Sequence, residues 1–84
     1  MSDRRWPCAC CGYLTLTEEP SGTYDICPVC FWEQDNVQEG DPSYWGGANR
    51  VSLNDARENF KRFGAVEERL VVSVREPTLD EKPD

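Results

Sequence analysis

Two short cysteine motifs decide how this chain folds: Cys8-Ala9-Cys10-Cys11-Gly12 and Cys27-Pro28-Val29-Cys30. Fifteen residues separate Cys11 from Cys27, so the pattern is C-x2-C-x15-C-x2-C. Two residues between paired cysteines allow a tight turn that directs both sulfurs to one point, and four thiolates at about 2.3 Å suit a tetrahedral zinc ion. The spacing therefore predicts four metal ligands, which are Cys8, Cys11, Cys27 and Cys30.

The expected metal is Zn²⁺ in a structural role. The chain has no histidine, so a site built from it relies on sulfur. Four sulfur ligands close the coordination sphere of zinc, whereas catalytic zinc sites keep one position open for water. We therefore expect no enzyme activity. Iron is the alternative metal, because four thiolates also hold iron in electron-transfer proteins.

The fifth cysteine, Cys10, is expected to lie outside the metal site. Cys8 and Cys11 keep the two-residue spacing, and the glycine that follows them can adopt the positive φ that the turn needs. Cys10 is then a small, partly buried thiol. The alternative is a redox-sensing thiol activated by the nearby metal.

The segment between the two motifs is expected to form a β-hairpin. Residues 13–17 alternate and are rich in β-forming residues, and residues 23–26 are the expected return strand. Residues 18–22 contain the proline and glycine that are typical of a turn. A hairpin with a cysteine pair at each end predicts a zinc-ribbon-like arrangement.

One α-helix is expected over about residues 53–63. Ser52 followed by Asp55 is typical of a helix start, and Gly64 is placed to end the helix in a left-handed conformation. Its apolar residues lie on one face at helical spacing, and they are Leu53, Ala56, Phe60 and Phe63. The predicted fold class is therefore a small α+β metal-bound domain, in which this helix packs on a zinc-ribbon-like hairpin.

The remaining segments set the domain boundaries. Residues 1–75 are expected to form a single cysteine-rich zinc-binding domain, in which residues 65–75 could be helix or strand. Residues 76–84 are rich in proline and charge, so we expect a disordered acidic tail. Residues 33–49 are expected to be a loop that packs or binds something, and their acids do not match a calcium-binding pattern.

Composition limits the functions open to the chain. With 84 residues it makes one domain, and a core this small usually needs a staple such as a metal. Sixteen acidic and nine basic residues give a net charge of -7, which disfavours nucleic-acid binding. No apolar run can span a membrane, and paired cysteines without a targeting segment favour a cytoplasmic protein.

A protein partner is expected, because the chain shows no catalytic set and has many aromatic residues for its length. One or two of them can serve as exposed anchors for a partner. The aromatic residues considered are Trp6, Tyr13, Tyr24, Phe31, Trp32, Tyr44 and Trp45.

Motifs in several parts of the chain are shared with a known family. They are found in residues 6–16, in residues 23–33, in Gly47-Ala48-Asn49 and in residues 52–60. These motifs resemble the bacterial cysteine-rich CPCC family over about residues 6–64. The resemblance implies a small zinc-binding domain and no named activity. Ala9 departs from the family pattern, because it stands where the name-giving proline would be.

Two further resemblances leave alternatives open. Gly46-Gly47-Ala48-Asn49-Arg50 looks like a signature of the same family, and it is either a tight turn that positions the helix or a contact site for a partner. The two cysteine turns are also similar to those of rubredoxin. That similarity implies an alternative function as an iron electron carrier. A thiol redox protein, acting by dithiol exchange between its cysteines, is a further alternative.

Overall fold

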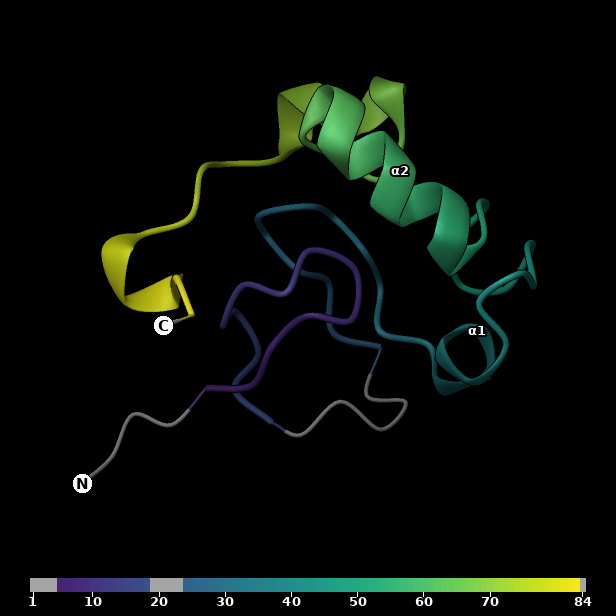
Figure 1. Cartoon of the computed structure of the whole chain (residues 1–84), viewed down its shortest axis with the longest axis horizontal. Helices are drawn as coiled ribbons and strands as arrows, with labels where there is room; N and C mark the ends of the chain where they lie inside the picture. The colour runs from purple at the N-terminus through teal and green to yellow at the C-terminus, as the bar shows by residue number, and fades with distance from the viewer. Residues whose placement is uncertain (1–4, 19–23, 84) are drawn as a thin grey trace.

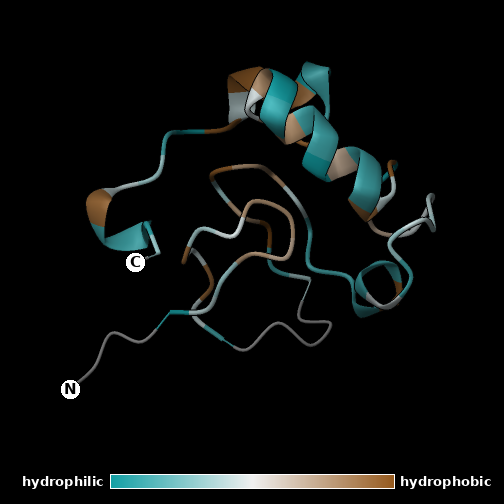
Figure 2. Cartoon of the chain, viewed as in Figure 1, coloured by the Kyte–Doolittle hydropathy of each residue, from teal (hydrophilic) through white to brown (hydrophobic). Residues whose placement is uncertain are grey.

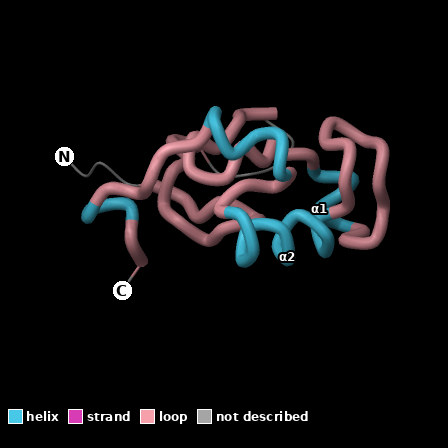
Figure 3. Tube along the Cα trace, turned by 90° about the horizontal axis from the view of Figure 1, so that it is seen from above, coloured by secondary structure: helices cyan, strands magenta, loops and turns pink. Residues whose placement is uncertain are grey.

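The two cysteine turns lie in the N-terminal half of the chain, and the longest helix lies in the C-terminal half (Figure 1). The computed structural model describes residues 5–18 and 24–83. Its elements, in chain order, are α1 (Asn36–Gly40), α2 (Leu53–Phe63) and the 3-10 helices η1 (Glu68–Ser73) and η2 (Leu79–Glu81). Figure 3 shows α1 and the loop after it at one end of the molecule and η2 at the other.

The expected hairpin of residues 13–17 and 23–26 is not formed, so the zinc-ribbon and α+β parts of the predicted fold are wrong. The described residues contain no strand, only two isolated antiparallel bridges, Trp6 with Leu16 and Ile26 with Glu33. Each bridge closes across one cysteine turn instead of joining the two turns. The backbone hydrogen bonds that close each cysteine turn bring together the residues on either side of it, which favours pairing across that turn. Residues 19–23 of the expected hairpin lie outside the described residues.

Helix α2 confirms the predicted helix and both of its ends. Asp55 donates its backbone N–H to Ser52 Oγ at 3.1 Å, and Gly64 ends the helix with a φ of 84°. Leu53 and Ala56 are buried in the core, and Phe60 packs against it while half-buried. Figure 2 shows hydrophobic and hydrophilic positions alternating along α2, as expected for a helix with one buried face.

The core is centred on the cysteines. Four of the five cysteines are buried, and apolar side chains pack around them from both halves of the chain. The largest of these side chains is Trp32, and the others in the core are Val29, Leu53, Ala56 and Val66. None of the helices in the described part of the chain is long and apolar enough to cross a membrane.

The C-terminal residues differ from the expected disordered tail. Residues 76–83 contain η2, and the Glu81 side chain is buried. Arg75 donates two hydrogen bonds to the Glu81 carboxylate, at 2.9 and 2.7 Å. Leu14 donates its backbone N–H to the Glu81 carbonyl at 2.7 Å. The bidentate Arg75–Glu81 pair therefore joins two parts of the C-terminal segment to each other, and the Leu14–Glu81 backbone hydrogen bond joins that segment to the residues after the first cysteine turn.

Candidate metal centre

The first cysteine turn is closed by two backbone hydrogen bonds. Gly12 donates its N–H to the Cys8 carbonyl at 2.9 Å, and Cys8 donates its N–H to the Tyr13 carbonyl at 2.9 Å. Gly12 has a φ of 80°, in the left-handed region where glycine meets no steric penalty. This tight turn places Cys8 and Cys11 on the same side of the backbone, as the sequence predicts.

The second cysteine turn repeats the first. Phe31 donates its N–H to the Cys27 carbonyl at 2.8 Å, and Cys27 donates to the Trp32 carbonyl at 2.9 Å. Phe31 takes the position of Gly12, with a φ of 74° that a bulky residue rarely adopts. The two turns face each other, so their cysteines meet.

The structure brings the four predicted ligands together. Their Sγ atoms all lie within 4.8 Å of one another. The Cys8 and Cys30 sulfurs are 3.6 Å apart, and the Cys11 and Cys27 sulfurs are 3.7 Å apart. With metal–sulfur bonds of about 2.3 Å, the edge of a regular tetrahedron is about 3.8 Å. The donor set therefore fits a metal ion held by four sulfurs.

Hydrogen-bond donors surround these sulfurs. The backbone N–H of Cys10 points to Cys8 Sγ at 3.4 Å, and that of Trp32 points to Cys30 Sγ at 3.4 Å. Gln34 Nε2 lies 3.4 Å from Cys8 Sγ, and Thr15 Oγ1 lies 3.1 Å from Cys27 Sγ. Donors of this kind stabilise thiolate over thiol, and they orient the sulfurs for a metal.

Two of these donors were missed in the sequence. Thr15 falls in the expected strand, and Gln34 falls in the expected loop, where a polar residue is ordinarily solvated. Gln34 is instead fully buried. Gln34 lies just after the second cysteine turn in the sequence. Its amide reaches a sulfur of the first turn only because the two turns face each other in the folded chain. No local sequence pattern signals such a contact.

The thiols change one another's pKa. The Cys27 pKa lies below its ordinary value, first because Cys11 hydrogen-bonds to its sulfur, while the same bond raises the pKa of Cys11. The pKa of Cys8 is lowered, chiefly by Cys11, and the pKa of Cys30 is raised, chiefly by Cys10. Four thiolates in this space need a cation between them.

Cys10 lies beside the centre but outside the group of four close sulfurs. It is buried, as expected for a small apolar thiol. Its backbone N–H points to Cys8 Sγ at 3.4 Å. The spacing argument therefore selects the same four cysteines that the structure brings together.

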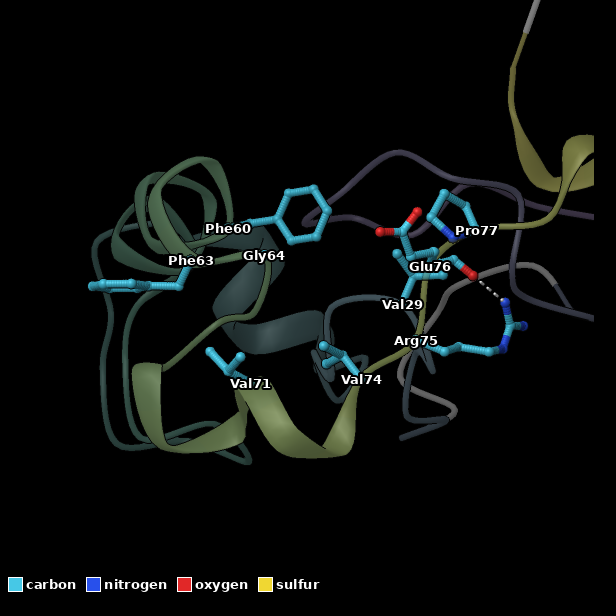
Figure 4. Close-up of a pocket in the computed structure, with 9 residues that line it drawn as sticks. All are labelled: Val29, Phe60, Phe63, Gly64, Val71, Val74, Arg75, Glu76 and Pro77. Atoms are coloured by element: carbon cyan, nitrogen blue, oxygen red, sulfur yellow. Dashed lines mark hydrogen bonds between the residues drawn. The ribbon is translucent and has the colours of Figure 1, made fainter.

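A pocket of about 450 Å³ lies behind the second turn, between α2 and the C-terminal segment (Figure 4). Val71 and Val74 project into it from the η1 side, and Phe60 projects from α2. Val29, between the two cysteines of the second turn, forms part of its wall. None of the cysteines lines it, so the pocket and the four-sulfur group are separate.

The fold and the site define a small cysteine-rich domain built around a four-sulfur centre. The model of the family described as cysteine-rich CPCC matches residues 6–81. The chain belongs to this family, which confirms the resemblance and extends it to the buried Glu81. No curated protein matches the chain.

Proposed function

We propose that this chain is a small zinc-binding protein in which a structural Zn²⁺ is held by Cys8, Cys11, Cys27 and Cys30. The observation that supports this most directly is the distance between sulfurs. Separations of 3.6 and 3.7 Å match the edge of about 3.8 Å expected for a tetrahedral zinc site. Four sulfur ligands leave no position for substrate, which supports a structural role over a catalytic one.

Zinc in this position would supply the folding energy that the small core lacks. Binding at a structural four-ligand site contributes on the order of 10 kcal/mol, and that energy is coupled to folding. The core side chains gather on the two turns, so their packing depends on the turns being held together. Loss of the metal is therefore expected to unfold the domain.

The rest of the proposal concerns what the folded domain does. We infer that it binds another protein, has no enzyme activity and acts in the cytoplasm, in bacteria as the family resemblance implies. The net charge of -7 supports a protein partner over nucleic acid. The closed sulfur site supports a binding role, because the metal has no open position for chemistry.

Elemental analysis of the purified chain is the experiment that tests the metal. We expect one zinc per chain and a colourless protein, with loss of the circular dichroism signal when a strong chelator removes the metal. Metal-free protein with an unchanged circular dichroism spectrum would contradict the structural role.

An iron electron carrier is the second candidate. Its specific support is the pair of similar turns, in which backbone N–H groups donate to the sulfurs of Cys8 and Cys30. Such hydrogen bonds also tune the reduction potential of iron bound by four cysteines. A red protein with one iron per chain and a reversible reduction wave would establish it in place of zinc. Metal-free chain with two disulfides in cells would favour the other alternative, a thiol redox protein.

A further inference from the structure

The loop after α1 displays two aromatic side chains that the core does not use. Trp45 is 72% exposed and Tyr44 is 45% exposed. The loop lies at the end of the molecule that carries α1 (Figures 1 and 3). Val37, on α1, is also an exposed apolar residue. Tryptophan and tyrosine left in solvent are the residue types that most often dominate binding at protein interfaces.

A fully buried amide holds this loop from the inside. Gln38 Nε2 lies within hydrogen-bond distance of the carbonyls of Tyr44, Asn49 and Val51, at 3.1, 3.2 and 3.0 Å. Its Oε1 accepts hydrogen bonds from the backbone N–H and side-chain amide of Asn49, both at 3.0 Å. One side chain of α1 therefore ties both arms of the loop to the domain.

A buried carboxylate fixes the middle of the loop. Asp35 caps α1 through Oδ1, and its Oδ2 accepts the N–H of Ala48 at 2.9 Å. A Cβ on Gly47 would lie 2.7 Å from that same Oδ2 and 2.9 Å from the Gln38 side chain. Only glycine fits there. The Gly46-Gly47-Ala48-Asn49-Arg50 segment is thus a turn packed tightly on α1, with Trp45 immediately before it.

The loop is also connected to the sulfur centre. Gln34 donates to Cys8 Sγ at 3.4 Å, and it precedes the capping residue of α1. Glu39 accepts from Trp32 Nε1 at 3.1 Å, which joins α1 to the second cysteine turn. The loop backbone that carries Tyr44 and Trp45 is therefore held in one arrangement, so a partner does not have to order the loop on binding.

The charge around the loop favours a cationic partner. Residues 33–50 carry four acids and one base: Glu33, Asp35, Glu39, Asp41 and Arg50. The pKa of Asp35 is lowered, first by the N–H of Ala48, so this carboxylate stays ionised. Carboxylates and the face of a tryptophan ring both attract ammonium and guanidinium groups, and the same charge repels phosphate-bearing ligands.

We propose that Tyr44 and Trp45 form the docking surface for a protein segment that carries lysine or arginine side chains. This inference rests on the proposed role as a protein-binding domain and names the surface and the chemistry of the partner. The cationic side chain lies over the Trp45 ring, and its charge is stabilised chiefly by Asp41, the exposed carboxylate among residues 33–41.

Peptide selection on the metal-loaded full chain tests the proposal. The probe is a phage-displayed library of random dodecapeptides, from which the enriched peptides are synthesised and titrated. We expect the enriched peptides to share lysine or arginine, to bind more weakly at high salt, and to shift the Trp45 indole resonance in NMR spectra. Trp45→Ala is expected to weaken binding at least tenfold.

Matched variants separate this surface from the rest of the domain. Val72→Ala is the control, because Val72 is 92% exposed on η1 and lies outside the loop; it is expected to leave affinity within twofold. Gly47→Ala is expected to weaken binding by displacing the loop while Trp45 is retained. Metal content is measured for every variant, so failure of the metal centre is seen separately from failure of this surface.

Several results would overturn the proposal. They are the absence of any enriched peptide, enrichment without basic residues, and equal affinity for Trp45→Ala and the unmodified chain. Binding that Trp45→Ala leaves intact would keep the protein-binding role and reject this surface. A single-stranded RNA oligonucleotide or an anionic phosphatidylglycerol vesicle that binds more tightly than the peptides, and through Trp45, would reject the class of partner.

Discussion

The two cysteine turns make the same hydrogen bonds with different residues. Gly12 in the first turn and Phe31 in the second occupy the same left-handed position, with φ of 80° and 74°. A Cβ at Gly12 would meet nothing within 4 Å, so the backbone conformation alone explains the glycine. Phe31 adopts that conformation in spite of its side chain, which costs roughly 1–2 kcal/mol.

The difference is explained by what surrounds each turn. In the second turn, the carbonyls of Pro28 and Cys30 accept backbone N–H groups of Arg75 and Val66, at 3.1 and 2.9 Å. In the first turn, the Ala9 carbonyl is instead bound by the exposed guanidinium of Arg57, at 2.9 Å. Phe31 also packs against the core. Strained backbone persists where the surrounding structure fixes it, and here the second turn is the fixed one.

The largest expected effect is the loss of a metal ligand, and it should be the same in both turns. Cys8→Ser and Cys27→Ser each remove one ligand, so both are expected to lose metal. With the metal they lose most of its contribution to folding, which is on the order of 10 kcal/mol. Cys10→Ser is the matched control, and it is expected to keep full metal content. Metal per chain and circular dichroism are the measurements. Equal metal loss in Cys8→Ser and Cys10→Ser would show that the first turn uses a different pair of sulfurs.

The next effect measures the strain in the second turn. Phe31→Ala removes ring contacts with the core and keeps the unfavourable φ, so it is expected to lower the free energy of unfolding by about 2–3 kcal/mol. Phe31→Gly loses the same contacts but relieves the strain. We therefore expect Phe31→Gly to be about 1 kcal/mol more stable than Phe31→Ala, although glycine is ordinarily the weaker residue. Denaturant unfolding of both zinc-loaded variants compares them.

A result in the usual order, with alanine more stable than glycine, would mean that position 31 carries no strain. Gly12→Ala then serves as the reference for the first turn, since its added Cβ meets open space. Its cost reports the backbone penalty alone.

A smaller effect comes from the C-terminal segment, which contacts both turns. Hydrogen bonds from Arg75 lower the pKa of Glu81 from its ordinary value of 4.5 to about 2. Because the folded pKa is the lower one, the charged form stabilises the fold above pH 4.5, and this contribution is lost as the pH falls toward 2. Glu81→Gln is expected to lower the Tm at pH 7 by about 5 °C. The effect is small because Arg75 is partly exposed, so that solvent screens its interaction with Glu81.

Thermal unfolding of the zinc-loaded proteins at a series of pH values checks this. The difference in Tm between Glu81→Gln and the unmodified chain is expected to be constant above about pH 5.5 and to narrow below pH 4.5. Acid also releases metal from cysteines, so metal content is measured at each pH and the Tm values are compared only where both proteins remain zinc-loaded. A difference independent of pH would assign the loss to packing and not to charge.

The sequence predicts the parts of this molecule that depend on local spacing. The two-residue spacing within each tight turn determines which cysteines can meet, and Ser52, Gly64 and the apolar stripe determine α2. These features need only a few neighbouring residues, so composition and spacing are sufficient. The spacing alone is therefore sufficient to select the four cysteines that come together.

The parts that failed depend on contacts that no local sequence pattern specifies. Residues 13–17 look like a strand, but Leu16 pairs with Trp6 across the first cysteine turn. The tail looks disordered because it is polar, yet its Glu81 finds Arg75 and becomes buried. Buried Gln38 is a similar case. It is a polar residue in a polar segment, so the sequence does not predict the three backbone carbonyls that its side chain contacts.

The smallest expected effect comes from giving the first turn the residue that the second turn has directly after its first cysteine. Pro28 occupies this position in the second turn and Ala9 in the first. The Ala9 N–H makes no hydrogen bond among the described residues, and the matching hydrogen bonds of the two turns place Ala9 where Pro28 stands. Ala9→Pro is therefore expected to raise the free energy of unfolding by about 0.5 kcal/mol, by restricting the unfolded chain. Urea unfolding of the zinc-loaded variant measures it, and a loss of metal or of stability would show that the two turns differ in backbone conformation before the second cysteine.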